Sequence, residues 1–214
     1  MKFIELFAGI GGFRYGLERC MGVEPTDKES EQTEPEVQLG GIRPSMEVER
    51  GILPTDIRGK RTIHCIWANE IDKYACQIYR RNYGEGELYE GDITKVSTED
   101  IPDHELLVGG VPCQAWSIAG KRKGFEDSRG TMWFECFRII EAKKPKHLLL
   151  ENVKGILSHN GGNSFERICE SICELGYVID FDVLNSKNFG VPQNRERVFL
   201  IGIREDLLDE CQIF

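Results

Sequence analysis

The clearest chemical signal in the sequence is a cysteine, Cys113, in the run GGVPCQAWS. The preceding segment Glu105–Gly109 has the composition of a short buried strand, and ligands of open α/β sheets bind beyond the carboxyl ends of the strands. A thiolate placed there could act as a nucleophile. From this run alone, a structural role for Cys113 remains the alternative. The sequence has no CxxC pair, so nothing indicates a zinc site among its other cysteines.

A carboxylate and two arginines are predicted to reach the same edge of the sheet. Glu151 follows the apolar run 146–150, and Arg195 and Arg197 lead into the last apolar run. Alternate residues of a strand share a face, so the two guanidinium groups are expected on one side. The alternative is a surface pair neutralised by Glu196.

A glycine-rich turn follows the first apolar run, in the order FAGIGGF. The flexible backbone of Gly9, Gly11 and Gly12 lets a ligand approach closely and directs helix N–H groups at an anion. The signal is weak by itself, because dehydrogenases, flavoproteins, methyltransferases and ligand-free turns share it.

Two acidic residues are predicted at the ends of the next strands. Glu70 fits a ribose-binding carboxylate, although it lies 59 positions after Gly11 instead of about 20. Removing residues 24–60 restores the usual spacing, which supports both the role of Glu70 and the reading of 24–60 as an insertion. Asp92, after the third predicted strand, adds a carboxylate at the same edge. Each acid alone could be a solvated loop carboxylate or a helix N-cap, but together they indicate a nucleoside site.

The pattern of apolar runs predicts the elements that hold these residues. We expect strands at 2–7, 63–69, 87–90, 105–109, 146–150, 177–184 and 197–203. Helical patterns cover 13–21, 72–82, 131–143 and 164–175, and the last should bury a face that includes Cys169 and Cys173. Seven strands alternating with helices predict an α/β fold with a mostly parallel sheet and helices on both faces.

Charge and composition indicate one globular domain with a surface insertion. The 214 residues carry 27 basic and 36 acidic groups, a net charge of −9, which argues against a protein that coats nucleic acid. Residues 24–60 are acidic and rich in Pro and Gly, so we expect a surface insertion, at least partly mobile, with 24–36 disordered. No signal peptide or membrane span is recognised, which predicts a cytoplasmic protein with reduced thiols.

The motifs resemble, in order, those of the C5 cytosine-specific DNA methyltransferases of bacterial restriction–modification systems. The similar segments are FAGIGGFRYGLE, NEIDKYA, GDIT, GGVPCQAWSIAGKRKGFEDSRGT, ENVKG and QNRERVFLIGIR. They cover residues 1–22 and 62–205, and six ordered motifs are very improbable by chance. The resemblance implies a Rossmann-like methyltransferase fold.

The resemblance also implies a reaction. Carbon 5 of cytosine is a poor nucleophile, and addition of the Cys113 thiolate to carbon 6 would create an enamine able to take a methyl group. Glu151 would share a proton with N3 of the ring. Arg195 and Arg197 would hold the ring carbonyl oxygen and a phosphate and keep the other two groups in position.

The implied cofactor is S-adenosyl-L-methionine (SAM), and no metal is implied. The resemblance implies that Phe7 would stack on adenine, that Ile71 would line the adenine pocket and that Pro112 would pack near the methyl group. The other cofactor-binding residues are implied to be Gly9, Gly11, Gly12, Glu70 and Asp92.

The implied substrate is double-stranded DNA, from which the target cytosine must be flipped. The segment after Cys113 would bind it as a mobile, basic loop. The residues of that segment expected at the DNA are Gln114, Ser117, Lys121, Arg122, Lys123 and Arg129.

One departure from the family concerns target recognition. The family's target-recognition region and C-terminal motifs have no counterpart in this sequence, so we expect a fragment or one subunit of a split enzyme, with a second polypeptide carrying the missing region. An RNA cytosine-5 methyltransferase and a non-catalytic cofactor-binding subunit remain alternatives. A nicotinamide dehydrogenase would not explain PCQ, ENV and RxR together.

Overall fold

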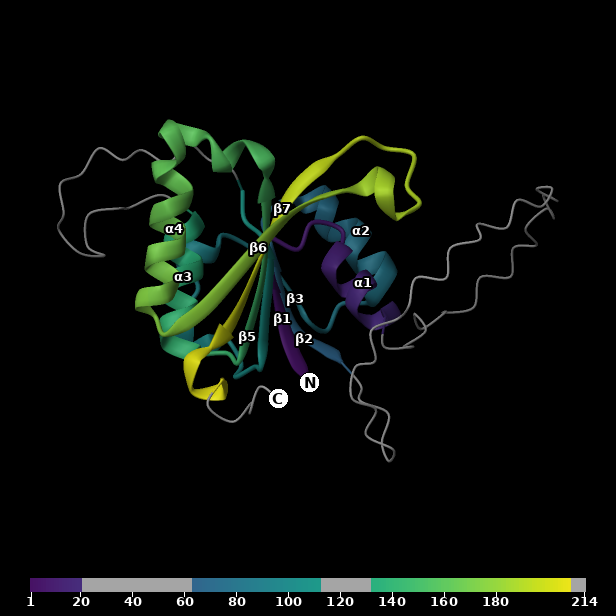
Figure 1. The fold of residues 1–214 in the computed structure, drawn as a ribbon. Coiled ribbons are helices and arrows are strands. Elements are labelled where there is room, and N and C mark those ends of the chain that lie inside the picture. Colours follow the sequence, from purple (N-terminus) through teal and green to yellow (C-terminus); the bar gives the residue numbers. More distant parts are fainter. Residues whose placement is uncertain (21–62, 113–131, 209–214) are drawn as a thin grey trace, which may run out of the picture.

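A computed structural model of the chain describes residues 1–20, 63–112 and 132–208, which form one seven-stranded sheet flanked by helices (Figure 1). The strand order is β3-β2-β1-β4-β5-β7-β6. The strands are β1 (Lys2–Leu6), β2 (His64–Glu70), β3 (Leu88–Glu90), β4 (Leu106–Gly110), β5 (His147–Val153), β6 (Tyr177–Asn185) and β7 (Glu196–Arg204).

The sheet is parallel from β3 to β5, whereas β7 is antiparallel to both of its neighbours. The predicted mostly parallel sheet is confirmed. The direction of β7 was not predicted, and it follows from the short connection after β6, which turns the chain straight back. As a result, the carboxyl ends of β1 to β5 lie at the same edge as the amino end of β7.

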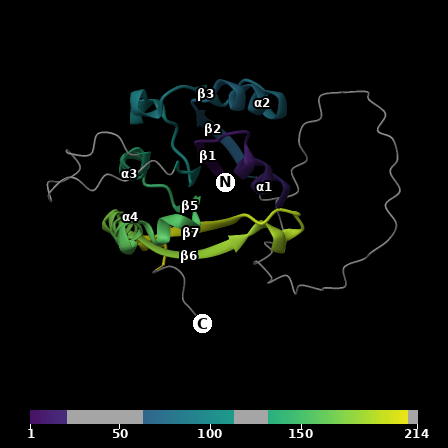
Figure 2. The same ribbon diagram turned by 90° about the horizontal axis from the view of Figure 1, so that it is seen from above.

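Among the described residues, four helices cover the two faces of the sheet (Figure 2). Helices α1 (Gly12–Cys20) and α2 (Lys73–Tyr83) lie on one face, and α3 (Met132–Lys143) and α4 (Asn163–Glu174) on the other. Short 3-10 turns complete the described connections: Ile93–Lys95, Thr98–Asp100, Lys154–Leu157, His159–Gly162, Ser186–Phe189 and Glu205–Leu207.

The central strand β1 supplies side chains to both hydrophobic cores. Ile4 and Leu6 pack into the larger core with α3 and α4, whereas Phe3 packs into the smaller core with Tyr79 of α2. This alternation is the period of two expected for a strand buried on both faces. The end of β1 is therefore fixed from both sides.

The predicted elements are all present, and their ends differ from the prediction by at most three residues. The largest difference is at β5, which continues through Glu151 and Asn152 to Val153, because pairing with β7 extends to Val153 and Arg197. Glu151 therefore belongs to a strand and not to the loop after it. The expected buried position of Cys173 is wrong: this side chain is exposed, and the core face of α4 contains Ile168 and Ile172.

Two further expectations concern the insertion and membrane-spanning helices. The insertion at 24–60 lies outside the described residues. None of the helices that the structure describes is long and apolar enough to span a membrane.

Glu5 is a buried carboxylate that caps α1 from the neighbouring strand. Its side chain is 1% exposed, and Oε1 accepts a hydrogen bond from the N–H of Phe13, at 3.1 Å. The first N–H groups of a helix have no partner within the helix, so this carboxylate stabilises the start of α1. Oε2 is buried without a hydrogen-bond partner among the described residues. Burial raises the pKa of Glu5 from 4.5 to about 7.

We expect Glu5→Gln to flatten the pH dependence of stability. A raised pKa means that the stability contributed by protonated Glu5 is complete below about pH 4.5 and is lost as the pH rises through 7. The variant carries no charge at this site, so its free energy of unfolding should exceed that of the wild type at pH 8, by up to ~3 kcal/mol. Urea unfolding at pH 5, 6, 7 and 8 measures this, with Glu166→Gln on the exposed face of α4 as control. Parallel curves for Glu5→Gln and wild type would contradict the prediction.

Candidate active site

The glycine turn begins at Phe7, whose backbone lies in the left-handed region. Its φ is 55°, and those of Gly9 and Gly11 are 55° and 87°. Such a φ is strained for a bulky residue and is found chiefly where surrounding structure enforces it, often at ligand sites. Here the N–H of Ala8 donates to the carbonyl of Asn69, at 2.9 Å, so the turn is tied to β2 immediately after Phe7.

Glu70 joins the end of β2 to the glycine turn. Its Oε2 accepts the N–H of Gly9 at 2.7 Å, and its Oε1 accepts the N–H groups of Ile71 and Asp72 at 2.8 Å each. A carboxylate offers about four acceptor positions, so these three bonds leave room for a further donor such as a hydroxyl group. The predicted role of Glu70 was ribose binding, with a solvated loop carboxylate or a helix N-cap as the alternatives. In the structure Glu70 also has a structural role, because it ties the glycine turn to the start of α2.

Asn69 connects β2 to the end of β3, where Asp92 lies. Its buried amide donates to the carbonyls of Gly91 and Tyr89, and the N–H of Gly91 donates to the carbonyl of Glu70. Asp92 caps the turn Ile93–Lys95, and hydrogen bonds from the hydroxyl and N–H of Thr94 lower its pKa. Asp92 therefore stays ionised near the end of β3.

These contacts bring the ends of β1, β2 and β3 into one corner. Ile71 there is 65% exposed, so its side chain is accessible to an apolar ligand. Flexible glycine backbone, an exposed apolar side chain and carboxylates with spare acceptor positions suit a nucleoside with ribose hydroxyls and a flat base. The residues predicted for an adenosyl group thus fit such a group.

Glu151 forms an ion pair with Arg197 at the other half of the edge. Arg197 Nε lies 2.7 Å from Glu151 Oε1, and the two side chains are 22% and 21% exposed. Glu151 lies opposite Phe199 in the β5–β7 ladder, which places it diagonally across from Arg197 on the same face. The antiparallel insertion of β7 is what brings the arginine to the carboxylate.

Arg195 is not brought to Glu151. It lies before the start of β7 with its side chain exposed, and the backbone N–H of Arg195 donates to Asn185 Oδ1 at 3.2 Å. Asn185 also donates to Asn194 Oδ1, so this buried asparagine orders the connection between β6 and β7. The two arginines expected on one face of a strand are thus divided between a loop and a strand.

The chain leading to Cys113 is held by β5. The N–H of Val111 donates to the carbonyl of Glu151 at 3.1 Å, and the amide of Asn152 donates to the carbonyl of Val111 at 3.1 Å. Pro112 is half-buried at the end of this segment. The remaining predicted site residues lie outside the described part of the chain: Cys113, Gln114, Ser117, Lys121, Arg122, Lys123 and Arg129.

Four of the other described cysteines are packed away from solvent to differing degrees: Cys65, Cys76, Cys136 and Cys169. Burial raises the pKa of Cys65 to about 12 and that of Cys169 to about 11, and it also raises the pKa of the fully buried Cys136. These thiols therefore stay protonated and unreactive. Within the described ranges, no group of three His, Cys, Asp or Glu residues could hold a metal ion.

Sequence analysis missed Asn69 and Asn152, which fix the strand ends that carry Glu70 and Glu151. A usable signal was present, because each asparagine adjoins its glutamate at the end of an apolar run. Buried amides of this kind need partners, and backbone carbonyls of the next strand are the nearest ones.

Comparison with known proteins decides the family. Residues 39–212 match the family of C-5 cytosine-specific DNA methylases. The chain belongs to this family. It is 42% identical over 207 residues to the type II methyltransferase M.HhaI of Haemophilus parahaemolyticus, covering 97% of this chain and 50% of that protein. It is 38% identical over 205 residues to M.SsoII of Shigella sonnei, covering 96% of this chain and 43% of that protein.

Solved structures agree on the fold of this methylase chain. A DNMT2 variant of Spodoptera frugiperda matches with a TM-score of 0.61 at 20% identity, covering 97% of this chain and 51% of that one. The S. pombe Dnmt2 methyltransferase matches with a TM-score of 0.58 at 17% identity, covering 96% and 49%. The expected Rossmann-like methyltransferase fold is confirmed. The 214 residues span about half the length of these relatives.

We expect Asn152→Ala to lower the free energy of unfolding by about 1–3 kcal/mol, because the buried Val111 carbonyl loses its donor. Thermal unfolding measures the change, and Asn188→Ala at an exposed position is the control. An Asn152→Ala protein as stable as the control variant would show that the methylase does not need this amide to hold the end of β4.

Proposed function

We propose that this chain transfers a methyl group from SAM to carbon 5 of a cytosine in double-stranded DNA, through a covalent adduct with Cys113. The observation that carries the proposal is the ion pair of Glu151 and Arg197 at the edge where β4 leads to Cys113, in a chain of the C-5 cytosine-specific methylase family. The family motifs around all three residues support the same assignment.

Cys113 supplies the nucleophile. Its thiolate adds to carbon 6 of the ring, forming an S–C bond, and the electron pair of the 5,6 double bond is then available at carbon 5. Bound SAM supplies an electrophilic methyl group on its sulfonium. Transfer breaks the bond between the methyl group and the sulfonium sulfur, which leaves S-adenosylhomocysteine. Loss of the carbon 5 proton to water then restores the double bond and expels the thiolate, so Cys113 is regenerated.

Glu151 stabilises the negative charge that addition of the thiolate creates at N3. Its Oε1 is held by Arg197, whereas Oε2 lies on the side of Gly110, where a Cβ would approach it to 3.4 Å. We assign to Oε2 the proton shared with N3, and to Arg197 the orientation of the carboxyl group. Arg195, exposed at the entrance to β7, is assigned to the ring carbonyl oxygen or a phosphate.

The corner formed by β1, β2 and β3 is assigned to the cofactor. Phe7 and Ile71 would contact adenine, Glu70 would accept from the ribose hydroxyls and Asp92 from the adenine amino group. The turn that contains Gly9, Gly11 and Gly12 would lie under the methionine portion, and Pro112 would lie near the methyl group.

The segment after Cys113 is assigned to DNA. Its residues Gln114, Ser117, Lys121, Arg122, Lys123 and Arg129 would contact the flipped cytosine and neighbouring phosphates. This basic segment offsets locally the net charge of −9.

We also propose a second polypeptide that supplies target recognition. The chain matches 50% and 43% of the length of the two relatives above. In addition, the face of β6 and β7 that points away from α4 leaves Val178, Ile201 and Ile203 at 48%, 47% and 37% exposure, and Val178 pairs directly with Ile203. These exposed apolar side chains, with the exposed Asp180 opposite Ile201, form the surface that we assign to the partner.

For the chemical step, we expect Cys113→Ser in the complete enzyme to abolish methyl transfer while SAM binding survives, because the cofactor contacts come from other loops. Transfer of tritiated methyl to DNA and a calorimetric titration with SAM measure the two properties. Normal turnover by the variant would overturn the covalent mechanism. Replacing DNA with RNA in the same assay distinguishes the RNA methyltransferase alternative, and inactivity of the wild type on both would favour a binding subunit.

For the second polypeptide, we expect residues 1–214 alone to bind SAM weakly and to methylate DNA negligibly. Addition of the complementing polypeptide, sought first in the adjacent reading frame, should restore activity. Ile201→Asp should prevent this complementation without affecting SAM binding by the chain alone, since Ile201 is exposed and away from the cofactor corner. Robust, sequence-specific methylation by 1–214 alone would refute the requirement for a second polypeptide.

A further inference from the structure

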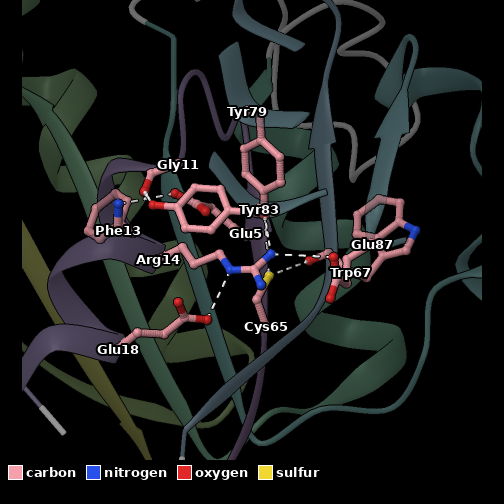
Figure 3. A network of polar contacts seen from close by, with 10 residues as sticks. All are labelled: Glu5, Gly11, Phe13, Arg14, Glu18, Cys65, Trp67, Tyr79, Tyr83 and Glu87. Atoms are coloured by element: carbon pink, nitrogen blue, oxygen red, sulfur yellow. Dashed lines mark hydrogen bonds and ion pairs between the residues drawn. The ribbon is translucent and has the colours of Figure 1, made fainter. Parts of the chain in front are cut away.

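Tyr83, the last residue of α2, contacts the glycine turn (Figure 3). Its hydroxyl donates to the carbonyl of Gly11 at 2.9 Å. Its ring fills the space where a side chain at Gly11 would lie: a Cβ there would be 2.3 Å from Tyr83 Cε2, and the φ of +87° also requires glycine. Gly11 and Tyr83 thus fit each other closely.

The carbonyl that Tyr83 binds is the one that starts α1. It also accepts the N–H of Tyr15 at 2.9 Å, so two donors fix its direction. The peptide unit is planar and trans, so the N–H of Gly12 points away from the Gly11 carbonyl. By holding the carbonyl, Tyr83 therefore directs the Gly12 N–H away from α2. The next N–H of α1, that of Phe13, is bonded to Glu5, so the Gly12 N–H is the one that the proposal below assigns to the cofactor.

A buried cation holds the Tyr83 ring in place. The guanidinium of Arg14 lies 4.3 Å from the ring centroid. Arg14 is itself fixed by Glu18 at 2.9 Å, by the Tyr79 hydroxyl at 3.1 Å and by Glu87 at 3.4 Å. Figure 3 shows the guanidinium between these partners, with Tyr83 between it and Gly11. Because these contacts already restrict the Tyr83 ring, it loses little rotational freedom when a ligand binds to the glycine turn.

A second contact from the same helix turn reinforces the first. The amide of Asn82 donates to the carbonyl of Ile10 at 3.4 Å, so α2 binds two consecutive carbonyls of the turn. Burial raises the pKa of the Tyr83 hydroxyl to about 12, which keeps it a hydrogen-bond donor at neutral pH.

We propose that Tyr83 is a positioning residue for cofactor binding, which acts through Gly11 by orienting the start of α1 toward the methionine portion of SAM. The proposal rests on the proposed function, because it assumes that the turn binds SAM. Tyr83 itself does not touch the cofactor. It sets the geometry of the backbone that does.

The test compares Tyr83→Phe with a matched control, Tyr177→Phe. Tyr177 is buried on β6, donates to the carbonyl of Pro145 at 2.6 Å, and its pKa is also raised to about 12, but its contacts lie on the opposite side of the sheet. Each variant removes one tyrosine–carbonyl hydrogen bond and keeps the ring. Both should lower the thermal midpoint by similar amounts.

Only Tyr83→Phe should weaken SAM binding, raising the Kd about threefold to tenfold, as expected for loss of one hydrogen bond. In the active enzyme the KM for SAM should rise while the KM for DNA and kcat stay close to wild type. Equal SAM affinity in wild type and Tyr83→Phe would overturn the proposal, and so would an equal loss in Tyr177→Phe.

Amide hydrogen exchange of the cofactor-free chain separates this proposal from the proposed function. Exchange in residues 9–15 should accelerate in Tyr83→Phe and not in Tyr177→Phe. If the wild type failed to bind SAM, the proposed function and the cofactor role of Tyr83 would both fall, while faster exchange would still show that Tyr83 holds the turn. Unchanged exchange together with unchanged affinity would refute the role of Tyr83 alone.

Discussion

The Glu70 carboxylate connects the parts on which the cofactor corner depends. It accepts N–H groups from Gly9 on one side and from Ile71 and Asp72 on the other, and so joins two loops that are far apart in sequence. The N–H of Gly9 is partly buried, whereas those of Ile71 and Asp72 are exposed and would otherwise bond to water. Asn69 extends this connection to β3. The same carboxylate can therefore be needed for folding and for ligand binding, and loss of binding in a Glu70 variant would not by itself identify a ribose contact.

The other half of the edge depends on strand direction. A parallel strand beside β5 would bring its carboxyl end to this edge, whereas antiparallel β7 brings its amino end. Residues at the start of β7 therefore lie beside residues at the end of β5, and Arg197 reaches Glu151. Ion pairs with about a fifth of each side chain exposed contribute modestly to stability, because solvent still screens them. The value of this pair is accordingly the fixed orientation of the carboxyl group.

The sequence predicted the elements well because apolar runs and helical periodicity report burial directly. It also placed Glu70, Asp92 and Glu151 at one edge, since that follows from strand ends in a parallel sheet. It could not predict that Glu70 accepts three backbone N–H groups. These bonds depend on the close approach of two loops that the insertion separates in the sequence. Nor could the sequence predict that Arg195 lies in a loop while Arg197 lies in β7. Alternation predicts one face only where both residues belong to the strand, and β7 begins between them, at Glu196.

The glycine pair that precedes Cys113 connects the two halves of the edge by close packing. A Cβ on Gly109 would lie 3.3 Å from both the Cβ and the carbonyl oxygen of Leu6, so a side chain there would require β1 and β4 to move apart by a few tenths of an ångström. A Cβ on Gly110 would lie 3.4 Å from Glu151 Oε2. One glycine thus faces the strand that carries the glycine turn, and the other faces the Glu151 carboxylate. Because these glycines are consecutive, any shift of β4 relative to β1 also moves it relative to Glu151. The distance between the cofactor corner and the Glu151–Arg197 pair is therefore set by backbone packing of β4 and not by a flexible side chain.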